Sequence, residues 1–274
     1  ENKVAGYIQL AEVYSAKGNE KEAKAYYNKA KQLDPNNEWA QQGFQASSVR
    51  SYIEDGRAAL EKGEYAKARD LFKQATEKQA QLPAAWLLLG VSQVQLGDYQ
   101  PARKALQKSL ELTNQQDQAW IYLARSYKQD GNLEQAENVL KLGLEAMPYS
   151  AELYLELGRQ REQAGLYEQA LEAFLQARDL RSDFSVYKQL ISIYLKLGRE
   201  RMAEVTLNQA RSDSKGGLSS SEQEKLKQWY GYEKLRIKAE EAVSEANYRV
   251  MQDLIEKSAS YKKRPLHNYL KAEA

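Results

Sequence analysis

Positively charged residues recur ahead of glycines that repeat along this sequence, mostly 33 or 34 residues apart. Arginine stands six residues before the glycine in three copies and two lysines extend the positive charge, so the set is Arg57, Arg125, Arg159, Lys128 and Lys188. A guanidinium donates paired hydrogen bonds to a carboxylate, so this set is suited to holding acidic groups of a partner. The alternative is that the arginines pair with Glu152, Glu156 and Glu162 on neighbouring helices and only solubilise the surface, because surface ion pairs are common and weak.

An apolar column of four residues stands ten residues before four of the glycines, and three of its members have an arginine four residues later. It consists of Ile53, Leu87, Ile121 and Leu155. Residues four apart share one face of a helix, so we expect the column to point outward with the arginines next to it. We therefore predict that this helix face binds an amphipathic or acidic segment, with the aliphatic column for affinity and the cations for orientation.

Residues suited to catalysis or metal binding are scarce. The chain has no cysteine and a single histidine, His267, which excludes a disulfide framework, a thiolate nucleophile, a cysteine-based zinc site and a histidine-pair metal site. Carboxylate pairs such as Glu240 and Glu241 lie in polar helical sequence, where nothing desolvates or orients them. The sequence also lacks a glycine-rich phosphate loop. We therefore expect a protein that is not an enzyme and has no cofactor or metal.

The overall charge is nearly balanced, with 40 lysines and arginines against 38 acidic residues and a net charge of +2. This balance argues against nucleic acid as a partner, which would favour a strongly basic face. Strong helix formers dominate, while only 5 prolines and 15 glycines occur, so we predict nearly all helix and no sheet. No run approaches the ~18 consecutive apolar residues of a membrane-spanning helix, so we expect a soluble chain.

The spacing of the glycines reveals an internal repeat. Six glycines are separated by 45, 34, 34, 34 and 33 residues, and they are Gly18, Gly63, Gly97, Gly131, Gly165 and Gly198. An alanine stands five residues after each one, at Ala23, Ala68, Ala102, Ala136, Ala170 and Ala203. A large apolar residue comes four later, at Tyr27, Phe72, Leu106, Leu140, Phe174 and Leu207. Glycine supplies the positive φ that a tight turn often needs, so each period predicts a helix, a turn and a second helix, with the alanine where the two helices cross most closely.

These columns resemble the tetratricopeptide repeat (TPR) family, whose pattern begins Trp-x-x-Leu-Gly-x-x-Tyr. The clearest matches are Trp86-x-x-Leu89-Gly90 and Trp120-x-x-Leu123-Ala124-x-x-Tyr127. The resemblance implies an all-α fold, a right-handed superhelical solenoid of about six helix-turn-helix repeats with a C-terminal helical cap. The copies lie near 4–37, 49–82, 83–116, 117–150, 151–184 and 184–217. It also implies that the first helices line a concave groove, where proteins of this family generally hold peptides or helices.

Residues 38–48 form an insertion between the first two copies. These 11 residues make about three helical turns at ~3.6 residues per turn, so we predict that they lengthen the first helix of the second copy without rotating its buried face. A break at Ser47 and Ser48 is the alternative. The second copy also has Asp55 where the other copies carry leucine, and we expect this copy to be the least well packed.

The repeat pattern ends near residue 217, and residues 218–274 form a further segment. A turn rich in serine and glycine at 212–217 precedes it, and Ser221 with Glu224 three residues later predicts a capping box at the start of a helix. The apolar spacing beyond predicts one amphipathic helix or a helix pair. This segment either caps the apolar end of the solenoid or docks a partner or a second copy of the chain. The basic tail at 262–265 is expected to be a solvated end.

Two functions remain open. The first is a non-catalytic scaffold or assembly factor that binds partner proteins or peptides in the groove of the repeat array, residues 1–217. The second is a regulatory module excised from a larger enzyme or receptor, since the chain begins at Glu1 rather than methionine and is processed or an excerpt. RNA binding would need a basic concave stripe, against which the net charge argues. Cytoplasmic and periplasmic placement both fit, and the lack of cysteine leans toward export.

Overall fold

The computed structural model describes residues 2–212, 218–244 and 248–257, and every regular element within them is an α-helix. Contacts between helices divide the chain into two compact units, Glu1–Met147 and Pro148–Ala274. The helices of the first unit are α1 (Asn2–Ala16), α2 (Glu20–Leu33), α3 (Glu38–Glu61), α4 (Tyr65–Lys78), α5 (Pro83–Leu96), α6 (Tyr99–Leu112), α7 (Asp117–Gln129) and α8 (Leu133–Ala146). Those of the second unit are α9 (Ala151–Gln163), α10 (Tyr167–Leu180), α11 (Phe184–Lys196), α12 (Glu200–Ser212), α13 (Ser220–Ser244) and α14 (Tyr248–Lys257). The predicted all-α repeat fold is confirmed, while the handedness of a superhelix stays a prediction.

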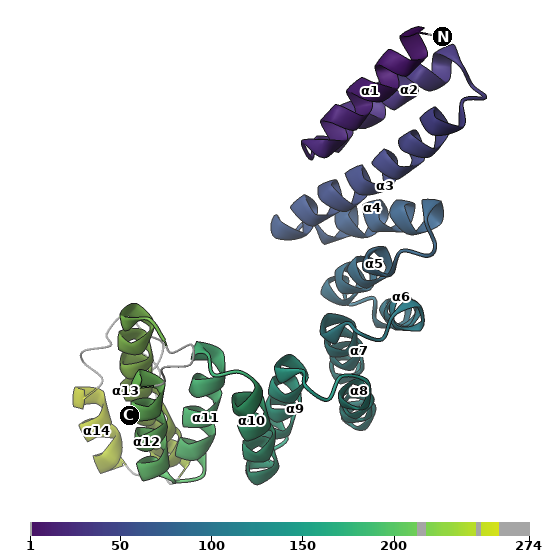
Figure 1. Cartoon of the computed structure of the whole chain (residues 1–274). Helices are drawn as coiled ribbons and strands as arrows, with labels where there is room; N and C mark the ends of the chain where they lie inside the picture. The colour runs from purple at the N-terminus through teal and green to yellow at the C-terminus, as the bar shows by residue number, and fades with distance from the viewer. Residues whose placement is uncertain (1, 213–217, 245–247, 258–274) are drawn as a thin grey trace. The chain divides into compact units, whose positions relative to one another are not determined.

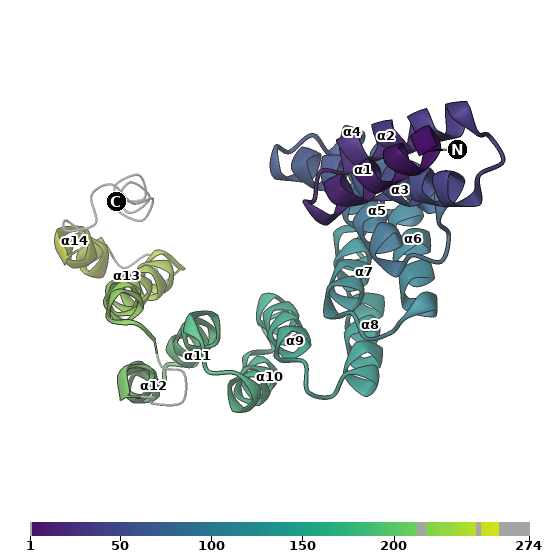
Figure 2. The same ribbon diagram turned by 45° about the horizontal axis from the view of Figure 1, so that its top comes forward.

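Successive helices pair as hairpins, and each hairpin can be followed in Figure 1 and Figure 2. The six turn glycines have the left-handed backbone conformation that the repeat predicted, with φ between 68° and 84°. At the end of α5, the amide of Asp98 donates to the carbonyl of Gln93 at 2.9 Å and closes the turn around Gly97. Asn19 and Asn132 then cap the second helices of their hairpins by accepting a backbone amide hydrogen. Glycine is needed here because a β-carbon is disfavoured in this conformation.

The alanine column is predicted to lie where the two helices of a hairpin approach most closely. All six alanines are 0% exposed, and the large apolar residues four positions later are at most 9% exposed. On the facing helix of three hairpins the contact residue is glycine. A β-carbon on Gly158 would stand 2.4 Å from the ring of Phe174, and Gly56 and Gly90 are placed in the same way. These three hairpins are therefore tightly packed at the large apolar residue, while the position of closest crossing at the alanine stays a prediction.

Helix α3 is continuous from Glu38 to Glu61 (Figure 1), as the length of the insertion predicted. No break occurs at Ser47 and Ser48, which are both helical and buried. Asp55, the residue that interrupts the leucine column, pairs with Lys21 of α2 at 2.8 Å. Its partly exposed carboxylate therefore joins α2 to α3 in place of an apolar contact.

Two hairpins share α3. The ring of Tyr27 on α2 lies against Gly43 in the inserted turns, and the ring of Phe72 on α4 lies against Gly56 in the second half of the helix. The inserted residues thus give α2 its own length of α3, and the remaining length pairs with α4 as the first helix of an ordinary repeat.

An aromatic residue stands eleven positions before each turn glycine. Trp86 donates its indole N–H to the carbonyl of Ala80 at 2.7 Å, and Trp120 donates to the carbonyl of Asn114 at 2.9 Å. Each bond ties the loop before a first helix to that helix. In the other four copies the residue is tyrosine, namely Tyr7, Tyr52, Tyr154 and Tyr187.

Two helices, α13 and α14, follow the sixth hairpin. Of the two predicted alternatives for this segment, a helix pair rather than one amphipathic helix is therefore correct. The capping box consists of Ser219 and Glu222: the amide and hydroxyl of Ser219 donate to the carboxylate at 2.9 and 2.6 Å, and the hydroxyl accepts the amide of Glu222 at 3.3 Å. The prediction of Ser221 and Glu224 was wrong, because a run of serines offers several hydroxyls and two glutamates offer the carboxylate. The predicted turn at 212–217 begins one residue too early, because Ser212 is the last residue of α12. The rest of that turn, 213–217, lies outside the described residues, as do the basic tail at 262–265 and His267.

Helix α13 packs against α11 and α12. Leu226 joins the apolar core around α11 and is 0% exposed. Glu200 of α12 pairs with Lys234 at 2.6 Å and with Lys238 at 3.0 Å. The boundary predicted at 217 stays a prediction, since the division by contacts falls between α8 and α9.

Candidate functional site

The apolar column predicted to supply affinity is only partly exposed. Ile53 on α3 and Leu87 on α5 are half-buried, whereas Ile121 on α7 is 9% exposed and Leu155 on α9 is 3% exposed. Leu155 belongs to the apolar core of the second unit. An outward-facing strip through all four copies therefore does not hold for Ile121 and Leu155, because both side chains are covered by the helices around them.

Helix α5 presents its own apolar strip. Ala84, Leu87, Leu88 and Val91 are all partly exposed, and their spacing of three and four residues places them on one side of the helix. We call these four residues the α5 strip. The 14 residues of α5 include no charged side chain. Leu89 on the other side is buried in an apolar cluster with residues of α3, α4 and α6, and Leu88 packs against the edge of this cluster. An uncharged helix with a partly exposed apolar side is a candidate interaction site, because exposed apolar patches commonly mark one.

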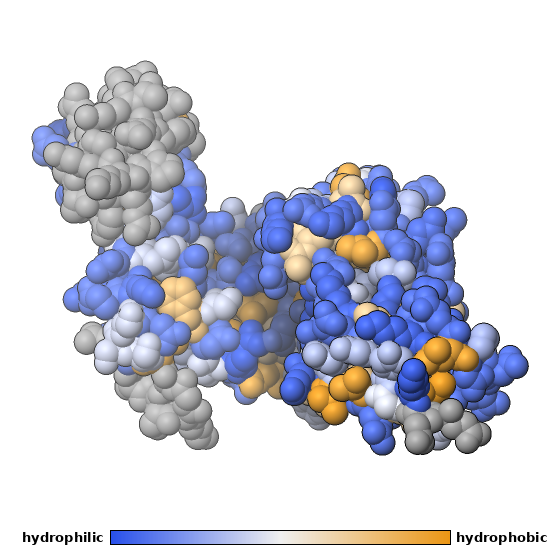
Figure 3. All heavy atoms as spheres, turned by 90° about the horizontal axis from the view of Figure 1, so that it is seen from above, coloured by the Kyte–Doolittle hydropathy of each residue, from blue (hydrophilic) through white to orange (hydrophobic). Residues whose placement is uncertain are grey.

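Two of the predicted cations, Arg125 and Lys128, lie on α7, which packs beside α5. The guanidinium of Arg125 lies 5.3 Å from the ring centre of Tyr122, and Lys128 is partly exposed. Arg57 on α3 is exposed. Most of the surface seen in Figure 3 is hydrophilic, with hydrophobic side chains in small separate groups. An apolar strip with cations nearby can accommodate a segment that carries both apolar side chains and carboxylates.

The two predicted cations of the second unit are engaged within it. Arg159 pairs with Glu156 at 3.5 Å and donates to the hydroxyl of Ser185 at 3.2 Å. The Nζ atom of Lys188 lies 5.1 Å from the ring centre of Trp229 on α13. The alternative interpretation, in which arginines pair with nearby glutamates, therefore describes Arg159.

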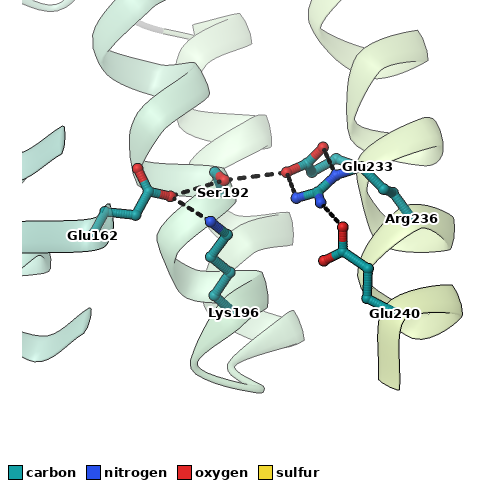
Figure 4. A network of polar contacts seen from close by, with 6 residues as sticks. All are labelled: Glu162, Ser192, Lys196, Glu233, Arg236 and Glu240. Atoms are coloured by element: carbon teal, nitrogen blue, oxygen red, sulfur yellow. Dashed lines mark hydrogen bonds and ion pairs between the residues drawn. The ribbon is translucent and has the colours of Figure 1, made fainter. Parts of the chain in front are cut away.

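A polar network joins α9, α11 and α13 (Figure 4). The hydroxyl of Ser192 lies 3.2 Å from the carboxylate of Glu233 and 3.4 Å from that of Glu162. Arg236 donates to Glu233 at 2.7 and 3.0 Å, and hydrogen bonding to this carboxylate raises the pKa of the guanidinium. Lys196 pairs with Glu162 at 3.0 Å. Because both carboxylates have a cationic partner, the network fixes α13 against α11 beside the position of Lys188.

The described residues show neither a metal centre nor a membrane span. Within them, no group of three or more acidic or histidine side chains is placed to hold a metal ion. No helix in the same ranges combines the length and hydropathy needed to cross a membrane.

Comparisons with known proteins bear on the repeat assignment. The family model described as the cilia and flagella-associated protein 70 C-terminal domain matches residues 1–229. No curated protein matches the chain. A thermophilic TPR protein from Thermus thermophilus is 23% identical, with a TM-score of 0.51 over 68% of this chain and 98% of its own. A tetratricopeptide repeat protein from Parabacteroides merdae is 17% identical, with a TM-score of 0.50 over 84% of this chain and 99% of its own. At these identities the two structures bear on the fold alone.

Proposed function

We propose that this chain, which belongs to the family of the cilia and flagella-associated protein 70 C-terminal domain, a family of tetratricopeptide repeats, is a non-catalytic scaffold that binds other proteins. Stacked helical hairpins create extended surfaces suited to this task. The observation that supports the proposal most directly is the α5 strip. A surface helix normally carries charged or polar residues on its outer side, and α5 has partly exposed apolar residues there instead.

The proposed site is centred on the α5 strip in the first unit. Ile53 and Arg57 contribute from α3, and Arg125 and Lys128 contribute from α7. The partner segment is amphipathic: its apolar side chains pack on the strip, and its carboxylates accept hydrogen bonds from the arginines. We place the main contacts of the partner in the first unit, because the α5 strip lies there.

Affinity capture from a lysate of the source organism tests this site when the baits are matched variants. Leu87→Glu places a charge in the strip, and Arg125→Glu reverses a cation beside it. Lys104→Glu, on the exposed surface of α6, makes the same charge reversal elsewhere and is the control. We expect the bound protein to be lost from the first two baits and retained by the control, with unchanged circular dichroism in all three. Equal capture by all baits would place the partner on another surface.

A second candidate function is that of a regulatory module within a longer protein. The observation in its favour is that the matching family is described as a C-terminal domain. The partner of the strip would then be another part of the same polypeptide. Sequencing the full transcript tests this: an enzyme or receptor domain in the same reading frame would support it, and a frame that encodes helical repeats alone would contradict it.

We also propose that α13 and α14 cap the second unit. The apolar contact of Leu226 and the ion pairs of Lys234 support this role, because they use α13 to cover α11 and α12. Docking of a second copy through these helices is the alternative, and light scattering decides between them: a monomer mass fits the cap, and a dimer that α13 surface charge reversals dissociate would fit docking.

A further inference from the structure

A cavity of about 500 Å³ opens between α4, α5 and the start of α6, on the side of α5 opposite to the α5 strip. Trp86 and Leu89 supply apolar wall, and Arg69 and Thr76 line the α4 side. Gln93 lines it as well, and its side-chain oxygen is buried without a hydrogen-bond donor among the described groups. A buried acceptor without a donor is uncommon and unfavourable, so its presence here needs an explanation.

We call the boundary between two successive hairpins a junction. The cavity lies at the junction of α4 and α5, and the next junction, between α6 and α7, has the same sequence positions 34 residues further along. There Tyr127 stands in the place of Gln93, and Arg103 stands in the place of Arg69. The central guanidinium carbon of Arg103 lies 4.7 Å from the ring centre of Tyr127, so a cation covers the aromatic ring. The space filled by a tyrosine ring between α6 and α7 is thus left open between α4 and α5.

A second residue that occupies space at the next junction is replaced by a smaller residue at the cavity. Leu110 of α6 corresponds to Thr76 of α4. The hydroxyl of Thr76 donates to the carbonyl of Lys73 at 2.8 Å, so its polar atom is satisfied within α4. The orphaned oxygen of Gln93 is therefore the group that a bound molecule would need to satisfy.

Arg69, the counterpart of the arginine that covers the ring of Tyr127, already lines the cavity. Arg69 pairs with Asp70 at 2.9 Å and with Asp98 at 3.8 Å. Arg103 is held similarly at its own junction, by Asp130 at 2.8 Å. Both junctions thus have a guanidinium anchored by acidic residues, and only one of them has a ring beneath it.

We propose that this cavity binds a tyrosine side chain of a partner protein, whose ring takes the place that Tyr127 holds at the next junction. The ring packs on Trp86 and Leu89 with Arg69 over it, and the phenol hydroxyl donates to the oxygen of Gln93. No tyrosine is among the residues that line the cavity, so we assign the ring to a partner protein. This site lies on a different side of α5 from the strip and does not depend on the function proposed for the strip.

Titration of the full chain with N-acetyl-L-tyrosinamide, followed by ¹H–¹⁵N NMR, tests the proposal. We expect saturable shifts of the indole N–H of Trp86 and of the side-chain amide of Gln93, and none with N-acetyl-L-alaninamide, which lacks the ring. Gln93→Tyr should fill the cavity from within, abolish the shifts and raise the melting temperature. Gln95→Tyr adds the same side chain at an exposed position of α5 and should bind the probe like the wild type.

Arg69→Ala tests the same site without filling it, should Gln93→Tyr fail to fold. Loss of the cation above the ring should weaken probe binding about threefold, as expected for a partly exposed cation–π contact. Arg125→Glu, which alters the surface near the α5 strip, should leave the titration unchanged, so failure of one site is distinguishable from failure of the other. The proposal is overturned if the wild type shows no saturable shifts, or if the folded variants Gln93→Tyr and Arg69→Ala bind the probe as the wild type does.

Discussion

Replacing Gly158 by alanine tests how tightly the two helices of a hairpin are packed. The new β-carbon would stand 2.4, 2.6 and 2.9 Å from three ring carbons of Phe174, a residue that is 0% exposed. Ordinary contacts between carbon atoms are about 3.5–4.0 Å. The ring or the helix must therefore move by roughly 1 Å in a close-packed interior.

Two effects oppose each other in this variant. Alanine is favoured over glycine inside a helix by roughly 1 kcal/mol, whereas overpacking of a core costs roughly 1–3 kcal/mol. Because the ring of Phe174 is rigid and enclosed, we place the steric cost at the upper end of this range. The expected net result is a loss of roughly 2 kcal/mol in the free energy of unfolding.

The double variant Gly158→Ala with Phe174→Leu supplies the internal control. It recreates the pair that the fourth copy already uses, Ala124 at 2% exposed and Leu140 at 0% exposed. Urea unfolding by circular dichroism, with hydrogen exchange of the amides of α9 and α10, compares the wild type, both single variants and the double variant. We expect the double variant to be more stable than the sum of the single effects by roughly 1–2 kcal/mol. A coupling energy near zero would refute the reasoning, because it would mean that the β-carbon and the ring do not collide.

The long helix α3 and the contact between α12 and α13 give two further predictions. Ala46→Pro, within the inserted turns, should cost roughly 3 kcal/mol and remove helical chemical shifts around 44–49; wild-type protein without helical shifts there would contradict a continuous helix. Hydrogen bonds from Lys234 and then Lys238 lower the pKa of Glu200, so this contact contributes fully above the ordinary carboxyl range and is lost as the pH falls through the lowered value. Amide exchange of α13 should therefore quicken as the pH falls from about 6 to about 3 in the wild type, after correction for intrinsic rates. Glu200→Gln should flatten this dependence, and an unchanged profile would assign it to other groups.

The repeat fold was predictable because each sequence column encodes one short-range contact. The turn glycines have positive φ, and the alanines are fully buried, because both properties depend on a hairpin of about 34 residues rather than on the whole chain. The capping box was harder, since Ser219 and Ser221 differ little in sequence and only the geometry of α13 selects one of them. The aromatic column was a detectable signal, because it has the same spacing as the glycines.

The candidate site was less predictable because exposure depends on neighbouring helices. Leu87 and Leu155 occupy the same column, yet Leu155 is covered by the core of its unit. Lys188 faces Trp229, a residue 41 positions away in a segment outside the repeat pattern. Leu88 belongs to a different column and was not predicted. The signal that could have found it was the absence of charge along 83–96, which marks a helix that is apolar on both sides.

The shared helix α3 determines how the first unit comes apart. In most repeat arrays a terminal hairpin can fray alone, because each repeat contacts only its neighbours. Here the N-terminal hairpin rests on the inserted turns of the same uninterrupted helix that holds α4. Fraying of α1 and α2 would strip half of that helix of its packing, so the first two repeats should open together as one cooperative block. The inserted turns thus couple these two hairpins, so local opening and proteolysis at either one require the packing of both to be lost.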